Sequence, residues 1–184
     1  MKKILYNYLQ QNGISIDQDV FYYGISLFKN YLLFFIITIP FIIHYSLYYQ
    51  MITFFIFYIP LRRYLGGFHF NQSNICIFAS SFVSIIICLS SKYYNIQYIN
   101  YLYSFITLLF LTIYHAPVDH KNKRLTLNEK NVYKNKAIII EIFFFIFSII
   151  AYFILKNFII IIMYYINLLN ILNLILGKYF SKNS

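Results

Sequence analysis

Residues 137–176 read AIIIEIFFFIFSIIAYFILKNFIIIIMYYINLLNILNLIL. The stretch contains two apolar runs, 137–155 and 158–176, which meet at Lys156 and Asn157. A helix needs about 20 predominantly apolar residues to cross the hydrocarbon core of a bilayer. Two such runs in direct succession predict a pair of membrane-spanning helices, and therefore an all-α, polytopic integral membrane protein.

The composition of the whole chain agrees with this prediction. Of 184 residues, 61% are hydrophobic and 11% are charged, whereas charged residues make up about 25% of an ordinary soluble domain. Mean hydropathy is +0.65. These values exclude a soluble globular domain and intrinsic disorder. We expect one membrane domain over 1–184.

The chain before residue 61 divides into two expected regions. In residues 1–30, apolar side chains recur at helical spacing and Asp17–Asp19 occupy the other face, which predicts interfacial amphipathic helices. The apolar stretch 31–59 would measure about 44 Å as one helix, more than a hydrocarbon core of about 30 Å. A polar patch at 44–50 interrupts it, so we expect a short helical hairpin over 31–60, with complete or partial crossing left open.

The distribution of cations predicts the topology. Further spans are expected at 75–91 and 97–115, followed by a basic loop over 116–136. With about six spans, 13 Lys and Arg residues lie on one side and 2 on the other; with five spans the split is 10 to 5. The positive-inside rule favours six spans, with both termini in the cytoplasm. Because the cations stand between apolar runs, we interpret them as topology signals and expect no nucleic-acid partner.

The polar residues of highest interest lie at 61–76, LRRYLGGFHFNQSNIC, which we regard as the candidate catalytic segment. His69 and Cys76 could form an imidazolium–thiolate pair, the usual activation of a cysteine nucleophile. Seven residues span about 10 Å along a helix axis, too far for a hydrogen bond. We therefore predict that the Cys76 helix starts between Asn71 and Asn74, with Ser73 or Asn74 as cap and His69 on a separate turn.

A simpler interpretation stands beside this one. The same residues could form an arginine-rich topology signal, an ordinary Gly66-Gly67 turn and a structural cysteine. Residue chemistry alone favours this simpler interpretation, because one His and one Cys are weak evidence for catalysis.

The string Arg62-Arg63-Tyr64-Leu65-Gly66-Gly67-Phe68-His69, with Cys76 seven residues later, resembles the signature of the accessory gene regulator B family. Members of that family are membrane cysteine endopeptidases of Gram-positive bacteria that process precursors of cyclic quorum-sensing peptides. Arg62, Gly67 and Cys76 stand at the family's positions around the His. A weaker resemblance covers Ala116–Asp119 and Asn122-Lys123. Arg124-Leu125 departs from the pattern, because many relatives have a proline near that place.

The resemblance implies roles for these residues. Cys76 would be the nucleophile and His69 its base, with Arg62, Gly66 and Gly67 supporting the site. The implied substrate is a short propeptide with an amphipathic leader and an acidic tail. Cleavage through an acyl-thioester on Cys76, followed by ring closure, would give a thiolactone or a lactone. No cofactor is implied, and the remaining partners are membrane lipid and, as an open alternative, a second copy of the chain.

The basic residues around the site have two interpretations of equal weight. Attraction of an acidic tail is one, and plain topology is the other. These residues are Arg62, Arg63, Lys121, Lys123 and Arg124.

The rival functions are a non-catalytic membrane protein and a zinc protease. A non-catalytic transporter or peptide-export partner would also contain scattered polar residues, although transporters more often place them near the membrane midplane. A zinc protease lacks its ligand motif, since no His-Glu-x-x-His occurs. Glu141 is the one acid inside an expected span, and it lies close enough to Lys136 that snorkelling or pairing is expected in preference to catalysis.

Overall fold

The computed structural model describes residues 6, 8, 10, 12–13, 17–68, 72–118, 125–154 and 158–182. Within this part of the chain the architecture is all-α, as expected. The helices are α2 (Gln18–Tyr45), α3 (Tyr48–Leu65), α4 (Ser73–Tyr93), α5 (Tyr98–His115), α6 (Leu127–Ile154) and α7 (Phe158–Lys182).

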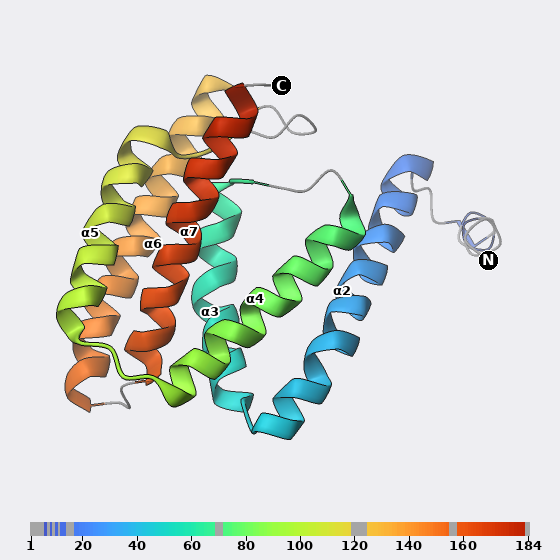
Figure 1. Cartoon of the computed structure of the whole chain (residues 1–184). Helices are drawn as coiled ribbons and strands as arrows, with labels where there is room; N and C mark the ends of the chain where they lie inside the picture. Colours follow the sequence, from blue (N-terminus) through green and yellow to red (C-terminus); the bar gives the residue numbers. More distant parts are fainter. Residues whose placement is uncertain are drawn as a thin grey trace.

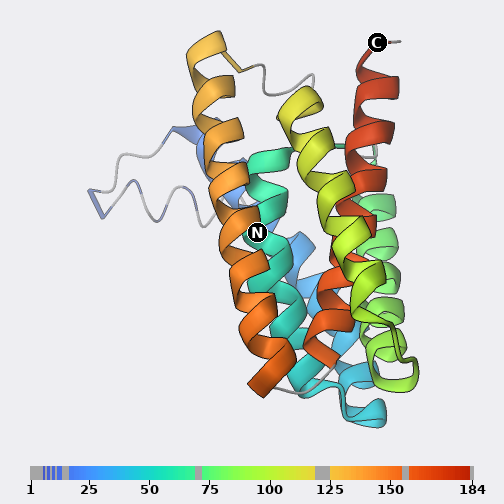
Figure 2. The same cartoon turned by 90° about the vertical axis from the view of Figure 1, so that its left-hand side faces the viewer.

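The helices form a bundle with one lateral extension. α7 packs against α3, α4, α5 and α6, and α3 also contacts α6 (Figure 1). α4 leans obliquely across the bundle and carries α2 on its outer side. The turned view in Figure 2 shows α5, α6 and α7 standing roughly upright beside one another. The core of the bundle therefore lies among α3, α5, α6 and α7, where Leu61, Leu108, Ile162 and Leu174 are buried.

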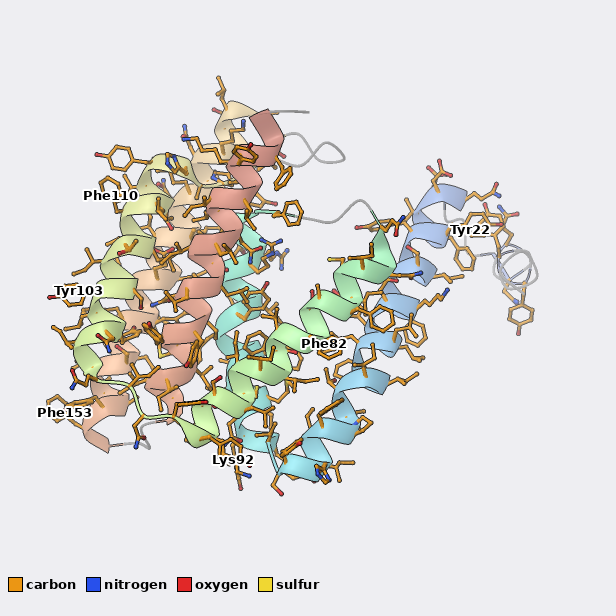
Figure 3. All side chains as sticks on the ribbon, viewed as in Figure 1. Tyr22, Phe82, Lys92, Tyr103, Phe110 and Phe153 are labelled. Atoms are coloured by element: carbon orange, nitrogen blue, oxygen red, sulfur yellow. The ribbon has the colours of Figure 1, made fainter. Side chains whose placement is uncertain are left out.

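Four of these helices, α2, α4, α6 and α7, are long and apolar enough to cross a membrane. Large apolar side chains cover the outer surface: Tyr103, Phe110 and Phe153 point away from the bundle in Figure 3 and are 58–78% exposed. Such a surface suits lipid and not water. The protein is therefore a polytopic membrane protein. α3 and α5 have 18 residues each, and the count of about six spans stays a prediction for them.

The boundaries of the N-terminal regions differ from those expected. Residue 30 is not a helix end, because α2 runs without a break from Gln18 to Tyr45. No strong breaker stands near residue 30, and the single Gly24 costs only about 1 kcal/mol relative to Ala. The hairpin turn does occur in the expected polar patch: Ser46 has a φ of 53°, and the N–H of Leu47 donates to the carbonyl of Ile42 at 2.9 Å. α3 then continues past residue 60 to Leu65.

The basic loop is also shorter than expected, because α6 begins at Leu127 and not near 137. Thr126 and Glu129 form a capping box at its start. The N–H of Thr126 donates to Glu129 Oε2 at 2.8 Å, and the N–H of Glu129 donates to Thr126 Oγ1 at 3.3 Å. This reciprocal pair satisfies backbone donors at the helix start. The Thr126-Leu127-Asn128-Glu129 pattern is typical of a helix start. It was not used in placing the helix because the expected span was set by the apolar residues alone.

Candidate active site

The candidate nucleophile lies in the first turn of α4. The helix begins at Ser73 after Gln72, which confirms the predicted start between Asn71 and Asn74. Gln72 takes the cap position without a side-chain hydrogen bond, so the expectation of Ser73 or Asn74 as cap is wrong. The N–H of Cys76 donates to the carbonyl of Gln72 at 3.2 Å, and the thiol is free and half-buried. Three backbone N–H groups precede it at the positive end of the helix.

His69 lies with residues 70 and 71 outside the described part of the chain. Its predicted approach to the Cys76 sulfur therefore stays a prediction. What the structure does give is the path of the chain up to Phe68, one residue before His69.

Arg62 braces this path from the last turn of α3. Its guanidinium donates through Nη1 to the carbonyl of Gly66 and through Nη2 to the carbonyl of Phe68, each at 2.5 Å. Hydrogen bonds from a charged donor are roughly twice as strong as neutral ones. Arg62 thus holds the backbone of the 62–68 turn.

Gly66 and Gly67 make the turn possible. Their φ angles are 69° and 123°, a region that L residues rarely adopt. A Cβ on Gly66 would collide with the backbone carbonyl of Val118, and one on Gly67 would collide with the Arg62 guanidinium. The N–H of Val118 donates to the carbonyl of Leu65 at 3.0 Å. This contact joins the described parts of the two segments that carry the resemblance, 62–68 and 116–118.

α7 closes the other side of the turn. The N–H of Phe68 donates to the carbonyl of Asn173 at 3.2 Å, and the rings of Phe68 and Phe180 lie 5.0 Å apart. Gly177 faces the turn so closely that an added Cβ would meet the backbone of Gly67 and Phe68 at 2.9 Å. The role of α7 was not expected from the sequence. An amide and a lone glycine inside an apolar helix were the signals that could have identified it.

Tyr58 completes the cluster from α3. Its side chain is hydrogen-bonded to that of Asn173, and it lies near enough to Arg62 and Cys76 for their charged forms to act on its ionisation. The cluster of Tyr58, Arg62, Cys76 and Asn173 therefore draws on three helices, α3, α4 and α7, which pack against one another. Tyr58 and Asn173 were not among the residues expected from sequence.

The remaining candidates fall in different places. Arg63 is exposed, and its guanidinium lies over the ring of Tyr64 at 5.8 Å. Lys121, Lys123 and Arg124 lie outside the described residues. Cys88 is fully buried in the core. Within the described ranges, no group of three or more His, Cys, Asp or Glu side chains is placed to hold a metal ion.

Most described cations lie at the end of the bundle that carries the turn, whereas Lys29 lies partway along α2. His115 at the end of α5 lies 2.8 Å from Lys178 of α7, measured between Nδ1 and Nζ. Lys92 lies at the opposite end of the molecule (Figure 3), where its Nζ donates to the carbonyl of Tyr45. The cations that share the turn's end are Arg62, Arg63, Lys130, Lys134, Lys136 and Lys178.

Comparison with known proteins agrees with the resemblance read from the sequence. The family model described as Accessory gene regulator B matches residues 2–176, nearly the whole chain. The match includes α2 to α6 and most of α7, together with the 61–76 segment. No curated protein and no solved structure matches the chain.

Proposed function

Because the chain belongs to the accessory gene regulator B family, we propose that it is a membrane cysteine endopeptidase that cleaves and cyclises a peptide precursor. Membership itself implies a part in the processing of quorum-sensing peptides. The observation that carries the finer proposal is the position of Cys76. A half-buried thiol stands in the first turn of α4, and the segment that carries His69 joins this helix to the Arg62-braced turn.

In the proposed reaction, His69 takes the thiol proton and the Cys76 sulfur attacks the carbonyl carbon of the peptide bond before the propeptide's acidic tail. The backbone N–H groups of the first turn of α4 stabilise the oxyanion of the tetrahedral intermediate. His69 then returns the proton to the leaving amine, the C–N bond breaks and the tail departs. The leader and core remain attached to Cys76 as an acyl-thioester.

Ring closure follows by acyl transfer. A thiol or hydroxyl of the propeptide core loses its proton to His69 and attacks the thioester carbonyl. The Cys76 sulfur leaves as thiolate and recovers the proton. The product is a thiolactone or a lactone, and a site that excludes water favours this transfer over hydrolysis.

The cations divide into two roles under this proposal. Arg62 donates to two backbone carbonyls, so bracing the turn is the role that its contacts support. Arg63, Lys121, Lys123 and Arg124 are then the candidates for attraction of the acidic tail. The gathering of described cations at one end supports a cytoplasmic location for this end and for the site.

Propeptide processing by protein reconstituted in liposomes tests the proposal. Cys76→Ala and His69→Ala should abolish cleavage, whereas the matched control Cys88→Ala should retain most activity. Wild-type protein stopped in mid-reaction should carry a hydroxylamine-sensitive acyl adduct, detectable by mass spectrometry. Full cleavage by Cys76→Ala would overturn the assignment of Cys76 as the nucleophile, and no cleavage by the wild type would favour the transporter or export partner.

The sidedness has its own measurement. In intact cells, single cysteines at positions 63 and 128 should be shielded from an external impermeant thiol reagent, and those at 93 or 157 should react. External labelling at 128 would reverse the orientation.

A further inference from the structure

Glu141 is a buried acid that the proposed reaction does not use. It lies on α6 inside the bundle and is 2% exposed. Thr112 of α5 donates its hydroxyl to Glu141 Oε1 at 2.6 Å. The other oxygen, Oε2, is buried without a hydrogen-bond partner among the described residues. A polar atom left in this condition inside a membrane protein is costly, because neither water nor lipid can satisfy it.

A small cavity lies beside this carboxyl group. Its polar lining comes from Glu141, Tyr101 and Asn167, and its apolar lining comes from α3, α5, α6 and α7. The cavity has a volume of about 10 Å³. That is close to the minimum for one water, which also needs two to four polar partners. The cavity is too small for a peptide or a lipid group.

The surroundings of Glu141 favour its neutral form. Among the residues that the structure describes, none forms an ion pair with Glu141. A buried carboxylate without a countercharge is far more expensive than a buried carboxylic acid. The Thr112 hydroxyl already donates to Oε1, so the proton of the acid belongs on Oε2, the oxygen that lacks a partner.

We propose that this cavity is a binding site for a single water molecule and that Glu141 is a neutral carboxylic acid donating its Oε2 proton to that water. The water donates in turn to the side-chain oxygen of Asn167, a lining residue of the same cavity. Asn167 is itself tied to α5, because its Nδ2 donates to Ser104 Oγ at 3.2 Å. The hydrated site thereby joins α5, α6 and α7, and interhelical hydrogen bonds of this kind hold membrane helices together.

Infrared spectroscopy of the full-length protein in nanodiscs tests the protonation state directly. The chain has only five acids, so a single protonated carboxyl can be assigned: Asp17, Asp19, Asp119, Glu129 and Glu141. At pH 7 the wild type should show the C=O stretch of a protonated, hydrogen-bonded carboxyl, and Glu141→Gln should lack it. A band that persists in Glu141→Gln, or a wild type with carboxylate bands alone, would overturn the assignment.

The water is tested in the same samples. Exchange into oxygen-18-labelled water should shift the O–H stretch of a buried water in the wild type, and the shifted band should be missing from Asn167→Leu. A wild type without this band contradicts a hydrated site. This outcome is independent of propeptide cleavage, so it separates the water site from the proposed enzymatic function.

Thermal unfolding distinguishes water from a bound cation. Gln at position 141 keeps an acceptor for Thr112 and a donor for the water, so Glu141→Gln should unfold within about 2 °C of the wild type. The wild-type midpoint should be the same in sodium, potassium and choline chloride. A sodium-dependent midpoint that Glu141→Gln abolishes would show an ionised Glu141 that binds a cation, and would overturn the proposal.

Discussion

The 62–68 turn is held by hydrogen bonds to backbone carbonyls. The hydrogen bonds that connect α5 with α6 and α7 join one side chain to another. Arg62 holds two carbonyls of the turn, and the N–H of Phe68 donates to a carbonyl of α7. In the bundle interior, Thr112 donates to Glu141, and Asn167 donates to Ser104. Backbone contacts fix the path of the chain, while side-chain pairs leave some buried atoms unsatisfied. We therefore expect substitutions at the turn to be far more damaging than substitutions in the interior.

The largest effect is expected for Gly66→Ala. Gly66 has a φ of 69° and a ψ of −146°, a region that is essentially restricted to glycine and costs an L residue on the order of 1–3 kcal/mol, and the new Cβ would collide with the carbonyl of Val118. The turn must then shift, and a displacement of about 1 Å can cost about 100-fold in rate. Propeptide cleavage should fall by about that factor, with a lower unfolding midpoint. The matched control is Gly24→Ala in α2, where nothing lies within 4 Å of the added Cβ and activity should be unchanged.

A second test separates the two neighbouring arginines. Arg62→Gln removes the guanidinium from two carbonyls of the turn, and hydrogen bonds to charged groups contribute about 1.5–3 kcal/mol each. We expect kcat to fall more than tenfold. Arg63→Gln leaves the turn intact and should raise KM a few-fold without lowering kcat. Equal changes in kcat for the two variants would contradict the bracing role of Arg62.

Much of the helical framework could be predicted from the length of the apolar runs. The expected spans at 75–91 and 97–115 agree with α4 and α5 to within two residues at each end. The glycine pair predicted a turn because Gly tolerates positive φ. The partners of that turn could not be read locally: Val118, Asn173 and Gly177 lie 50 to 110 residues away along the chain. These residues reach the turn because α7 and the segment after α5 pack on α3. No local sequence pattern predicts that packing.

Removal of the Tyr58 hydroxyl should lower activity less than the substitutions at Gly66 and Arg62. The hydroxyl connects Asn173 to the vicinity of Cys76, and a single neutral hydrogen bond contributes about 1 kcal/mol. Tyr58→Phe removes the hydroxyl and keeps the ring, which stacks on Phe54 with centroids 5.0 Å apart. We expect kcat to fall about fivefold, with little change in KM or in the unfolding midpoint. A drop in the midpoint without a change in kcat would assign Tyr58 to packing alone.

The smallest effect is expected for a substitution of Asn170, which lies one turn along α7 from Asn167 of the water site. This substitution should stabilise the protein. The residue is 1% exposed, and both polar atoms of its side chain lack partners among the described residues. Replacing such a group by an apolar side chain of similar shape removes a desolvation penalty. Asn170→Leu should therefore raise the unfolding midpoint by about 2–4 °C, the shift that about 1 kcal/mol produces in a chain of this size.

Asn167→Leu is the matched control: it breaks the hydrogen bond to Ser104 and should lower the midpoint by a similar amount. If both variants lowered the midpoint equally, Asn170 would have a partner in the membrane-embedded protein, and the contrast between turn and interior would weaken.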